Sequence, residues 1–204
     1  MRKILWFLIA TYSLPAHLQA QAQLVPVKKV IPTIICDIRY ATKNNFTGQQ
    51  VYNLSECYLL APVAQALNKV QKELSLQGLG LKIWDGYRPL AAQWKLWNIV
   101  PDKRYVSNPK KGGNHCRGAA VDVTLVNLKT GKELSMPTGF DEFTERAWAN
   151  YDNLPDDVKK NRKLLRDVMC KHGFSGIPLE WWHFDYKDWR DFPSLDIPLY
   201  QLGT

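Results

Sequence analysis

Histidine and cysteine are scarce in this sequence of 204 residues, which contains four of each. No two cysteines stand in the Cys-x-x-Cys spacing that is typical of structural zinc sites. The sequence also lacks the Gly-x-Ser-x-Gly elbow that presents the nucleophile in many serine hydrolases. These absences argue against a cysteine-ligated zinc module and against a hydrolase of the nucleophile-elbow class.

The positive charge of the chain is spread rather than clustered. Lys and Arg outnumber Asp and Glu by 27 to 19, which gives a formal net charge of +8. The basic residues are scattered, as along residues 159–163, where a solvent-exposed helix face explains them. Because no nucleic-acid-binding motif is present, we expect no nucleic-acid partner. A basic exported protein would instead be attracted to anionic cell-wall polymers.

One apolar run stands near the amino terminus. It follows a basic start of Arg2 and Lys3, and the small-x-small pattern of residues 20–22 fits a cleavage site. This pattern predicts a signal peptide over residues 1–22 and an exported mature domain over residues 23–204, periplasmic or secreted. The run is too short for a stable membrane anchor, and no other stretch is long and apolar enough to cross a bilayer. An amphipathic first helix of a cytosolic protein is the competing interpretation.

The mature chain of 204 − 22 = 182 residues suits a single domain that can bury a real core. Hydrophobic periodicity and turn signals predict three helices, over residues 62–77, 90–100 and 156–172, and three strands, over residues 79–84, 120–125 and 179–186. The apolar, β-branched residues 25–38 are interrupted by prolines, which indicates an edge strand or an extended arm. We therefore expect an α+β fold in which helices pack on a mostly antiparallel sheet.

The four cysteines would enter an oxidising compartment if the export prediction holds. Three pairings are possible, and the sequence does not choose among them. We favour a disulfide between Cys36 and Cys57, which leaves Cys116 and Cys170 either paired or free.

Two short stretches concentrate the side chains that can carry chemistry. The first contains His115 and Asp122, and the second contains Glu180 and His183. Two imidazoles and two carboxylates are the donors that hold a zinc ion with one coordination position open. Three histidines remain beyond the predicted signal peptide, and two of them fall here, each with a carboxylate close by. This combination favours a metal site over two unrelated histidines of the core or surface.

Local geometry suggests how these four residues divide their roles. Residues 120–125 alternate, so Asp122 lies on the opposite face of a half-buried strand from Val121 and Val123. A buried carboxylate requires a cation or hydrogen-bond donors, because its desolvation alone is costly. Glu180 and His183 are three residues apart, so they share a side on a helix or across a bulge, but not on a regular strand.

We assign His115, Asp122 and His183 as the ligands of one zinc ion, which would therefore sit on the sheet. Glu180 is then left free as a general base. Gly118 supports this assignment, since it lets the chain turn so that the histidine and the strand carboxylate reach one point. Spacing alone also permits the exchange of Asp122 and Glu180.

These residues also carry a family resemblance. His-x6-Asp followed by Glu-x-x-His resembles the zinc D,D-peptidases, and the closer similarity is to the VanX-type D-alanyl-D-alanine dipeptidases. The similarity runs from about residue 30 to 190 in six ordered blocks: Arg39-Tyr40-Ala41-Thr42, Asn45-Phe46-Thr47-Gly48, Asp85-Gly86-Tyr87-Arg88-Pro89, residues 115–125, Phe140-Asp141 and Glu180-Trp181-Trp182-His183. It implies zinc-dependent hydrolysis of a small D,D-dipeptide substrate.

The resemblance further implies two substrate contacts. It places Tyr40 in a loop that lines the substrate pocket, and it implies that Asp141 holds the free amine of the dipeptide. Local patterns offer alternatives, because Tyr40 also suits the rim of the core and Asp141 suits the N-cap of a helix over residues 142–149. One departure stands out: the family usually carries Ser just ahead of the first histidine, whereas Gly113 and Asn114 precede His115 here.

Arg88 follows the strand over residues 79–84, in a turn where functional side chains often sit on a rigid scaffold. We expect it to stabilise the oxyanion that forms at the scissile carbonyl, a contribution on the order of 3 kcal/mol. The alternative is a surface ion pair with Asp85. Residues 101–114, which include a Gly-Gly pair, form either a flap over the site or a disordered loop.

Two other functions compete with the dipeptidase. A D,D-carboxypeptidase that trims peptidoglycan stem peptides would need a cleft open on the amine side, whereas a dipeptidase closes it with a carboxylate such as Asp141. A non-catalytic zinc-stabilised binding domain would leave Glu180 and Arg88 unused, and structural zinc sites normally have four protein ligands. Iron or manganese in place of zinc is a weaker variant. The preference for D-alanyl-D-alanine rests on the resemblance alone, and oligomeric state is not readable from the sequence.

Overall fold

The computed structural model describes residues 23–100 and 102–203. The predicted signal peptide, residues 1–22, lies outside the described residues. Among the helices of the described ranges, none has the length and apolar character needed to span a bilayer.

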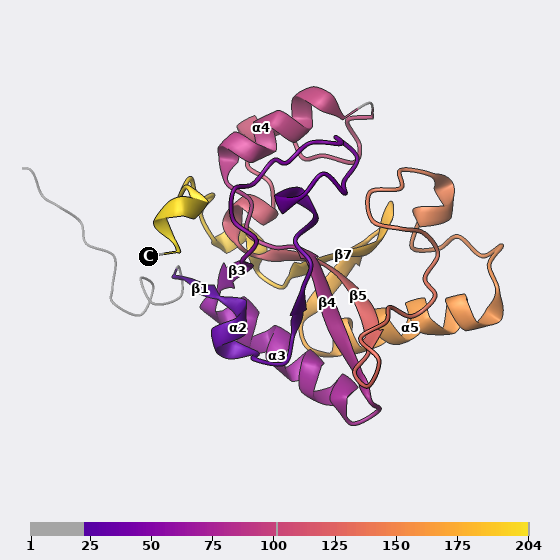
Figure 1. Ribbon diagram of the computed structural model, residues 1–204. Helices are drawn as coiled ribbons and strands as arrows, with labels where there is room; N and C mark the ends of the chain where they lie inside the picture. Colours follow the sequence, from indigo (N-terminus) through magenta and orange to yellow (C-terminus); the bar gives the residue numbers. More distant parts are fainter. Residues whose placement is uncertain (1–22, 101, 204) are drawn as a thin grey trace, which may run out of the picture.

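A five-stranded sheet runs through the centre of the molecule (Figure 1). Its strand order is β2-β4-β5-β7-β6, where β2 and β4 pair in parallel and the other neighbours pair antiparallel. The five strands are β2 (Ile35–Cys36), β4 (Leu79–Asp85), β5 (Ala120–Asn127), β6 (Phe174–Ile177) and β7 (Glu180–Tyr186). A separate antiparallel pair joins β1 (Leu24–Pro26) to β3 (Tyr58–Leu60). The predicted α+β class with a mostly antiparallel sheet is confirmed.

Four helices accompany the sheet: α2 (Val27–Val30), α3 (Ala61–Ser75), α4 (Leu90–Ile99) and α5 (Asp156–Lys171). Helices α3 and α5 pack against each other and against β4 and β6, whereas α4 lies beyond one end of the sheet (Figure 1). The predicted stripe of α3 explains its placement, because Val63, Leu67, Val70 and Leu74 are all fully buried. The three helices and three strands expected from periodicity are present, with ends that differ by a few residues.

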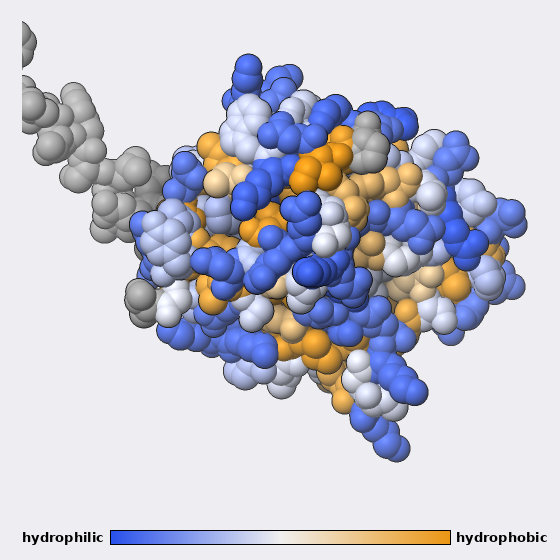
Figure 2. Space-filling model, turned by 45° about the horizontal axis from the view of Figure 1, so that its top comes forward, coloured by the Kyte–Doolittle hydropathy of each residue, from blue (hydrophilic) through white to orange (hydrophobic). Residues whose placement is uncertain are grey.

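The surface combines hydrophobic and hydrophilic residues. In the face shown in Figure 2, hydrophobic residues lie in small groups between hydrophilic ones. Few large hydrophobic side chains among the described residues are exposed, and two of them lie on α4: Leu76, Trp94, Ile99, Leu128 and Tyr200. The buried charged and histidine side chains are instead gathered at one end of β4, β5 and β7.

One local expectation is wrong and another is met only in part. Residues 142–149 do not form a helix and contain only the 3-10 turn Glu145–Ala147, because Asp141 has a left-handed φ of 59° and the next aromatic, Phe143, stacks on Tyr105. Residues 25–38 include β2 at the edge of the sheet, as one of the two interpretations predicted, but the short helix α2, whose Val27 is fully buried, interrupts the stretch. In both places tertiary packing overrides the local pattern.

The expected disulfide between Cys36 and Cys57 is also wrong, since all four cysteines are free thiols. Burial raises the pKa of Cys36 to about 11, and burial also raises the pKa of Cys57 well above its ordinary value. Both thiols are therefore held in the protonated, unreactive form. Cys116 is fully buried and Cys170 is exposed, so they lie in different environments and form no pair.

Candidate metal centre and active site

The pairing of three neighbouring strands brings the central polar residues side by side. Asp122 of β5 is opposite Asp85 of β4 on one side and opposite His183 of β7 on the other. All three side chains lie at the same end of the sheet and are buried. The alternation expected for residues 120–125 therefore places the carboxylate of Asp122 between its two neighbours.

His115 reaches the same point from a 3-10 turn, His115–Arg117, just before β5. Gly118 ends this turn with a φ of 65°, in the left-handed region that favours glycine. A Cβ atom at Gly118 would lie 2.7 Å from Cδ2 of Leu24, so a larger residue there would have to displace Leu24 as well as adopt a strained φ. The turn predicted at Gly118 is thus present, and it directs His115 toward Asp122.

An irregular register in the β6–β7 hairpin brings Glu180 to the same side as His183. Gly176 pairs with Phe184, but the next residue, Ile177, pairs with Glu180. Oε2 of Glu180 consequently lies 3.9 Å from Nδ1 of His183. The bulged strand expected from the spacing of three is confirmed.

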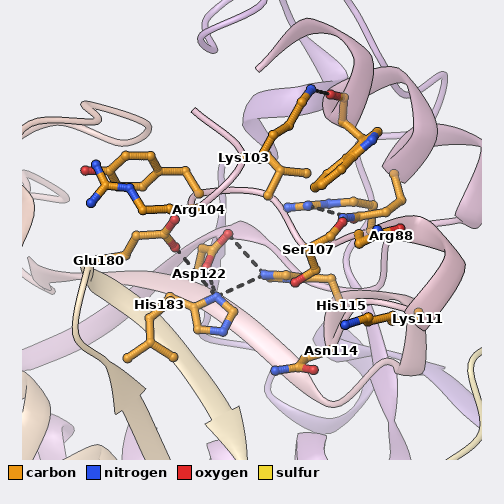
Figure 3. Close-up of a pocket in the computed structure, with 18 of the residues that line it drawn as sticks. Arg88, Lys103, Arg104, Ser107, Lys111, Asn114, His115, Asp122, Glu180 and His183 are labelled. Carbon is orange, nitrogen blue, oxygen red and sulfur yellow. Dashed lines mark hydrogen bonds and ion pairs between the residues drawn. The ribbon is translucent and has the colours of Figure 1, made fainter. Parts of the chain in front are cut away.

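His115, Asp122 and His183 form a compact triad whose ligand atoms all lie within 4.8 Å of one another. Nδ1 of His183 lies 3.0 Å from Oδ1 of Asp122, and Nε2 of His115 lies 3.4 Å from Oδ2 of Asp122. The two imidazole nitrogens are 3.2 Å apart (Figure 3). Three donor atoms thus converge on one point, which is the arrangement that the sequence predicted.

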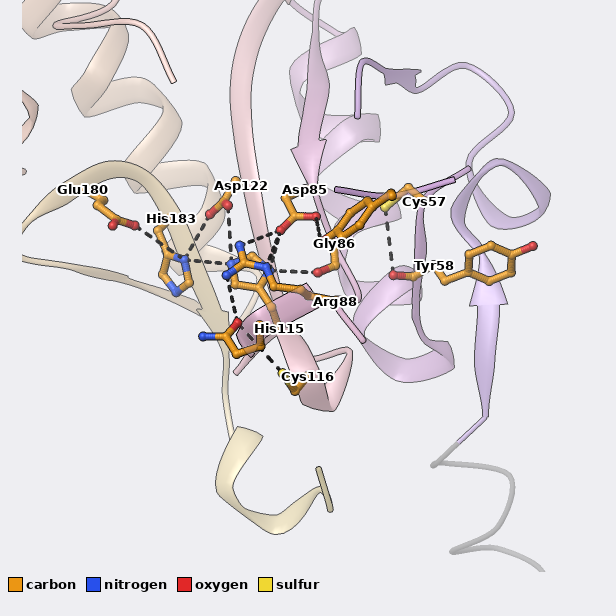
Figure 4. Close-up of polar contacts among 12 residues, drawn as sticks. Cys57, Tyr58, Asp85, Gly86, Arg88, His115, Cys116, Asp122, Glu180 and His183 are labelled. Atoms are coloured by element: carbon orange, nitrogen blue, oxygen red, sulfur yellow. Dashed lines mark hydrogen bonds and ion pairs between the residues drawn. The ribbon is translucent and has the colours of Figure 1, made fainter. Parts of the chain in front are cut away.

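The outer nitrogen of each imidazole is held by an acceptor, which fixes the tautomer. Nδ1 of His115 lies 2.8 Å from the carbonyl oxygen of Gly86, which can only accept, so this nitrogen donates its hydrogen and Nε2 is free (Figure 4). Nε2 of His183 lies 2.9 Å from Oδ1 of Asp185, so the ring keeps its hydrogen on Nε2 and offers Nδ1 as the ligand atom once a metal displaces the proton shared with Asp122. Such outer partners are typical of metal-binding histidines. Two imidazole nitrogens and one carboxylate fit a zinc ion with a fourth position open.

Burial and charge act differently on the two carboxylates. Burial by itself would raise the pKa of Asp122, but the imidazoles of His115 and His183 hold that pKa well below its usual range. For Glu180, burial raises the pKa to about 8, an effect that His183 opposes and Asp122 reinforces. Asp122 is therefore an ionised donor, whereas Glu180 can exchange a proton near neutral pH. A bound cation beside it would lower the pKa of Glu180.

Arg88 is buried and held in a fixed orientation. Its Nε and Nη2 donate to Oδ2 of Asp85 at 3.1 and 2.7 Å, and its Nη1 donates to Oε1 of Gln93 at 3.0 Å. Tyr52 donates its hydroxyl to the other oxygen of Asp85 at 3.0 Å, and the guanidinium lies 5.1 Å from the ring centroid of Tyr40. The expected pairing with Asp85 is present, but it is a buried pair at the site and not a surface one.

The triad lies in the wall of a pocket of about 490 Å³. Every residue that the sequence assigned to the site lines it: the triad together with Tyr40, Arg88, Asp141 and Glu180. Much of the remaining wall comes from the irregular stretch between α4 and the triad, including Tyr105 and Ser107. That stretch therefore flanks the site, as one of its two interpretations predicted.

The carboxylate of Asp141 has one buried oxygen that needs a hydrogen-bond donor or a cation. Its Oδ2 is buried and has no hydrogen-bond partner among the described residues. Burial, reinforced by the charges of Asp122 and Glu180, raises the pKa of Asp141 well above its ordinary value. A buried acceptor of this kind is costly unless a donor or cation meets it. Tyr40, in contrast, packs against Phe46, as the alternative interpretation held, and it also faces the pocket.

Sequence reasoning assigned no role at the site to three residues that shape it: Gln93, Asn114 and Asp185. Asp185 could have been found, since it stands two residues after His183 and so shares its side of a strand. Asn114 donates to the same carboxylate, with Nδ2 2.7 Å from Oδ1 of Asp185. No local signal identifies Gln93, because its role depends on a helix packed beside Arg88.

Comparison with known proteins identifies the family. Residues 20–196 match the family model described as D-ala-D-ala dipeptidase. The chain belongs to this family. It is 39% identical over 173 residues to the D-alanyl-D-alanine dipeptidase of Escherichia coli, which covers 85% of this chain and 89% of that protein. It is 32% identical over 193 residues to the D-alanyl-D-alanine dipeptidase of Enterococcus faecium, covering 84% of this chain and 95% of that protein.

A solved structure of the LdcB LD-carboxypeptidase overlaps more loosely, with a TM-score of 0.41 and 19% identity over 63% of this chain and 59% of that one. Family membership confirms the predicted class: the chain is a zinc metallopeptidase. The donor set of the triad fits the zinc ion that this class requires.

Proposed function

We propose that the protein hydrolyses the D-alanyl-D-alanine dipeptide in the pocket beside the triad. The observation that carries this proposal is the buried, unpaired Oδ2 of Asp141 in the same pocket. A free dipeptide brings a protonated amine that meets this carboxylate, whereas an acylated stem peptide does not. The names of the relatives from Escherichia coli and Enterococcus faecium support the same substrate.

In this proposal His115, Asp122 and His183 hold the zinc ion. When bound, zinc supplies a Lewis acid that polarises the scissile carbonyl and lowers the pKa of a water molecule toward roughly 7. The protein contributes the fixed tautomers of both imidazoles, because Gly86 and Asp185 keep Nε2 of His115 and Nδ1 of His183 available to the metal.

Glu180 acts as the general base. It lies beside His183 but outside the triad, and burial raises its pKa to about 8, which supports a role in proton uptake. Its carboxylate accepts a proton from the attacking water and then delivers that proton to the leaving amine. Asp122 is a poor candidate for this role, because its paired imidazoles keep it ionised.

Arg88 stabilises the oxyanion. A guanidinium has five N–H donors, and three of those of Arg88 are engaged with Asp85 and Gln93. Two donors therefore remain for the substrate. Because the side chain is already oriented, little reorganisation is needed when negative charge develops on the carbonyl oxygen. Tyr40 supports the guanidinium with its ring and forms part of the pocket wall.

The test is release of D-alanine from two substrates, D-alanyl-D-alanine and an N-acylated tripeptide ending in the same pair, each with and without a chelator. Chelator-sensitive cleavage of the dipeptide alone is the expected result. Cleavage of the acylated tripeptide would establish a D,D-carboxypeptidase and remove the role of Asp141. No cleavage of either by zinc-loaded protein would favour another dipeptide specificity or the non-catalytic binding domain.

Export through residues 1–22 is part of the proposal and rests on the sequence pattern alone. Expression of the full chain in a bacterium, followed by fractionation and N-terminal sequencing, tests it. We expect a mature protein outside the cytoplasm that begins at Gln23. An intact amino terminus in the cytoplasmic fraction would contradict the signal-peptide assignment.

A further inference from the structure

The pocket has two electrically different sides. Its acidic side carries Asp122, Asp141 and Glu180, which suit the zinc ion and the amine of a dipeptide. A free dipeptide also has a terminal carboxylate, and the fold provides four cationic residues along the pocket: Arg88, Lys103, Arg104 and Lys111.

Two of these cations are already neutralised by a carboxylate. Arg88 forms a buried ion pair with Asp85 at 2.7 Å. Arg104 forms an ion pair with Asp102, also at 2.7 Å, and donates to it through both Nε and Nη2. The two remaining N–H donors of Arg88 are assigned to the oxyanion, and Arg104 can meet a second carboxylate only by sharing its charge with Asp102.

Lys103 is occupied in another way. Its ammonium donates to the carbonyl oxygen of Trp97 and lies 4.7 Å from the ring centroid of the same tryptophan. It also donates to the carbonyl oxygen of Val100 at 3.4 Å. These contacts direct the side chain toward the end of α4 and away from the triad (Figure 3).

Lys111 differs from the other three. Its side chain is exposed and makes no hydrogen bond or ion pair within residues 23–100 and 102–203. Its backbone is nevertheless fixed, because it ends the 3-10 turn Pro109–Lys111, in which Lys111 N donates to the carbonyl oxygen of Asn108 at 3.0 Å. In Figure 3 its ammonium is directed toward the part of the pocket that holds His115 and Asn114. A fixed backbone with a free cation suits the binding of an anion.

The residues between Lys111 and His115 provide no second cation for this role. The two residues after Lys111 are Gly112 and Gly113, so the segment that leads to His115 offers no side-chain donor before Asn114. The amide of Asn114 is itself engaged with Asp185. Within residues 23–100 and 102–203, Lys111 is therefore the cation of the pocket wall whose side chain has no ion pair or hydrogen bond and can meet a substrate carboxylate.

We propose that Lys111 binds the terminal carboxylate of the dipeptide and thereby makes the enzyme prefer substrates with a free carboxyl terminus. This inference rests on the proposed function and assigns one further residue to it. A carboxylate that is bound equally in the ground state and the transition state affects KM rather than kcat. Lys111 is thus a specificity-determining residue and takes no part in proton transfer.

The test compares D-alanyl-D-alanine with its C-terminal amide, which is neutral at that end. Lys111→Ala should raise KM for the acid about tenfold, equivalent to about 1.4 kcal/mol, with kcat nearly unchanged. KM for the amide should stay the same, so the preference for the acid falls about tenfold. Lys110→Ala is the matched control, because Lys110 lies in the same turn but does not line the pocket. It should behave like the wild type.

Equal KM values for the acid in the wild type and Lys111→Ala would overturn the inference while leaving the dipeptidase activity established. If the zinc-loaded wild type cleaves neither compound, the proposed function fails, and calorimetric titration with D-alanyl-D-alanine decides the inference separately. Weaker binding by Lys111→Ala than by the wild type and Lys110→Ala would still support the carboxylate site. Equal binding, or binding by none of the three, would overturn it.

Discussion

Oδ1 of Asp185 lies 2.9 Å from Nε2 of His183, on the far side of that ring from Asp122. The contact decides which nitrogen of His183 is free to bind a metal. The same carboxylate oxygen accepts a hydrogen bond from Asn114, so its own position is fixed as well. The zinc site therefore consists of three ligand residues, which the sequence motif identifies, and of surrounding residues that hold those ligands in position.

Replacement of Asp185 should weaken zinc binding without removing a ligand. We expect Asp185→Ala to lower the affinity for zinc by about 10- to 100-fold, because His183 loses the acceptor that orients its ring. Competition with a chromophoric chelator measures the change. Asp191→Ala is the control, since Asp191 is an exposed carboxylate a few residues further along the chain. An unchanged zinc affinity in Asp185→Ala would contradict the orienting role.

Removal of the carboxylate of Glu180 should separate zinc binding from turnover. Glu180→Ala should retain one zinc ion per chain and lose about 10³-fold in kcat, within the usual range for general acid–base groups. Metal analysis and D-alanine release measure the two properties on the same sample. Glu145→Ala, at an exposed position in a 3-10 turn, should keep both. Full activity in Glu180→Ala would end its assignment as the base.

Gln93 should affect catalysis through Arg88. In Gln93→Leu one buried N–H of Arg88 loses its acceptor, and the 2.7 Å hydrogen bond from Gln93 to the carbonyl oxygen of Ser107 is also lost. We expect a loss of about 1–3 kcal/mol in the free energy of unfolding and a fall in kcat of about tenfold.

Gln71→Leu is the matched control for this prediction. Gln71 is equally buried, and its Oε1 accepts a hydrogen bond from the backbone of Leu81, but it does not line the pocket. It should lose comparable stability and keep its kcat. If the two variants lose kcat equally, the effect of Gln93 is one of general destabilisation and not of Arg88 orientation.

Asp141 should stabilise substrate binding at a cost to the stability of the metal-free protein. Its folded-state pKa is raised, so the folded protein binds more protons than the unfolded chain at this site. Stability that depends on this group is therefore lost as pH rises above the unfolded pKa of about 3.9. Asn tolerates a positive φ well, so Asp141→Asn preserves the backbone.

We expect the metal-free Asp141→Asn variant to melt roughly 2–4 °C above the wild type at pH 7.5, a shift that corresponds to about 1 kcal/mol. The difference should shrink toward pH 4. Calorimetry at the two pH values measures it. For the zinc-loaded enzyme, KM for D-alanyl-D-alanine should rise about tenfold or more, by loss of a charge-assisted hydrogen bond. If the melting temperature of Asp141→Asn, relative to that of the wild type, is lower at pH 7.5 than at pH 4, the predicted direction of the pH dependence is wrong.

Much of the protein could be predicted from local patterns. Hydrophobic periodicity and turn signals located α3, α4 and α5. A helix that buries one face carries apolar residues every three or four positions, and this spacing is visible in the sequence. The donors of the zinc site were identifiable for a similar reason: His and Asp in this combination are costly to bury without a metal. The disulfide prediction failed because spacing carries no information on which thiols a core will enclose.

Only the tertiary structure decided how these residues are arranged around the metal site. Spacing permitted an exchange of Asp122 and Glu180, but the pairing of β5 with β7 places Asp122 against both imidazoles and leaves Glu180 to one side. It also decided that Arg88 is paired with Asp85, whereas the side chain of Lys111 has no partner in the part of the chain that the structure describes. Partners distant in the sequence fix such properties, since hydrogen bonds and ion pairs depend on separations of a few ångströms that no local periodicity encodes.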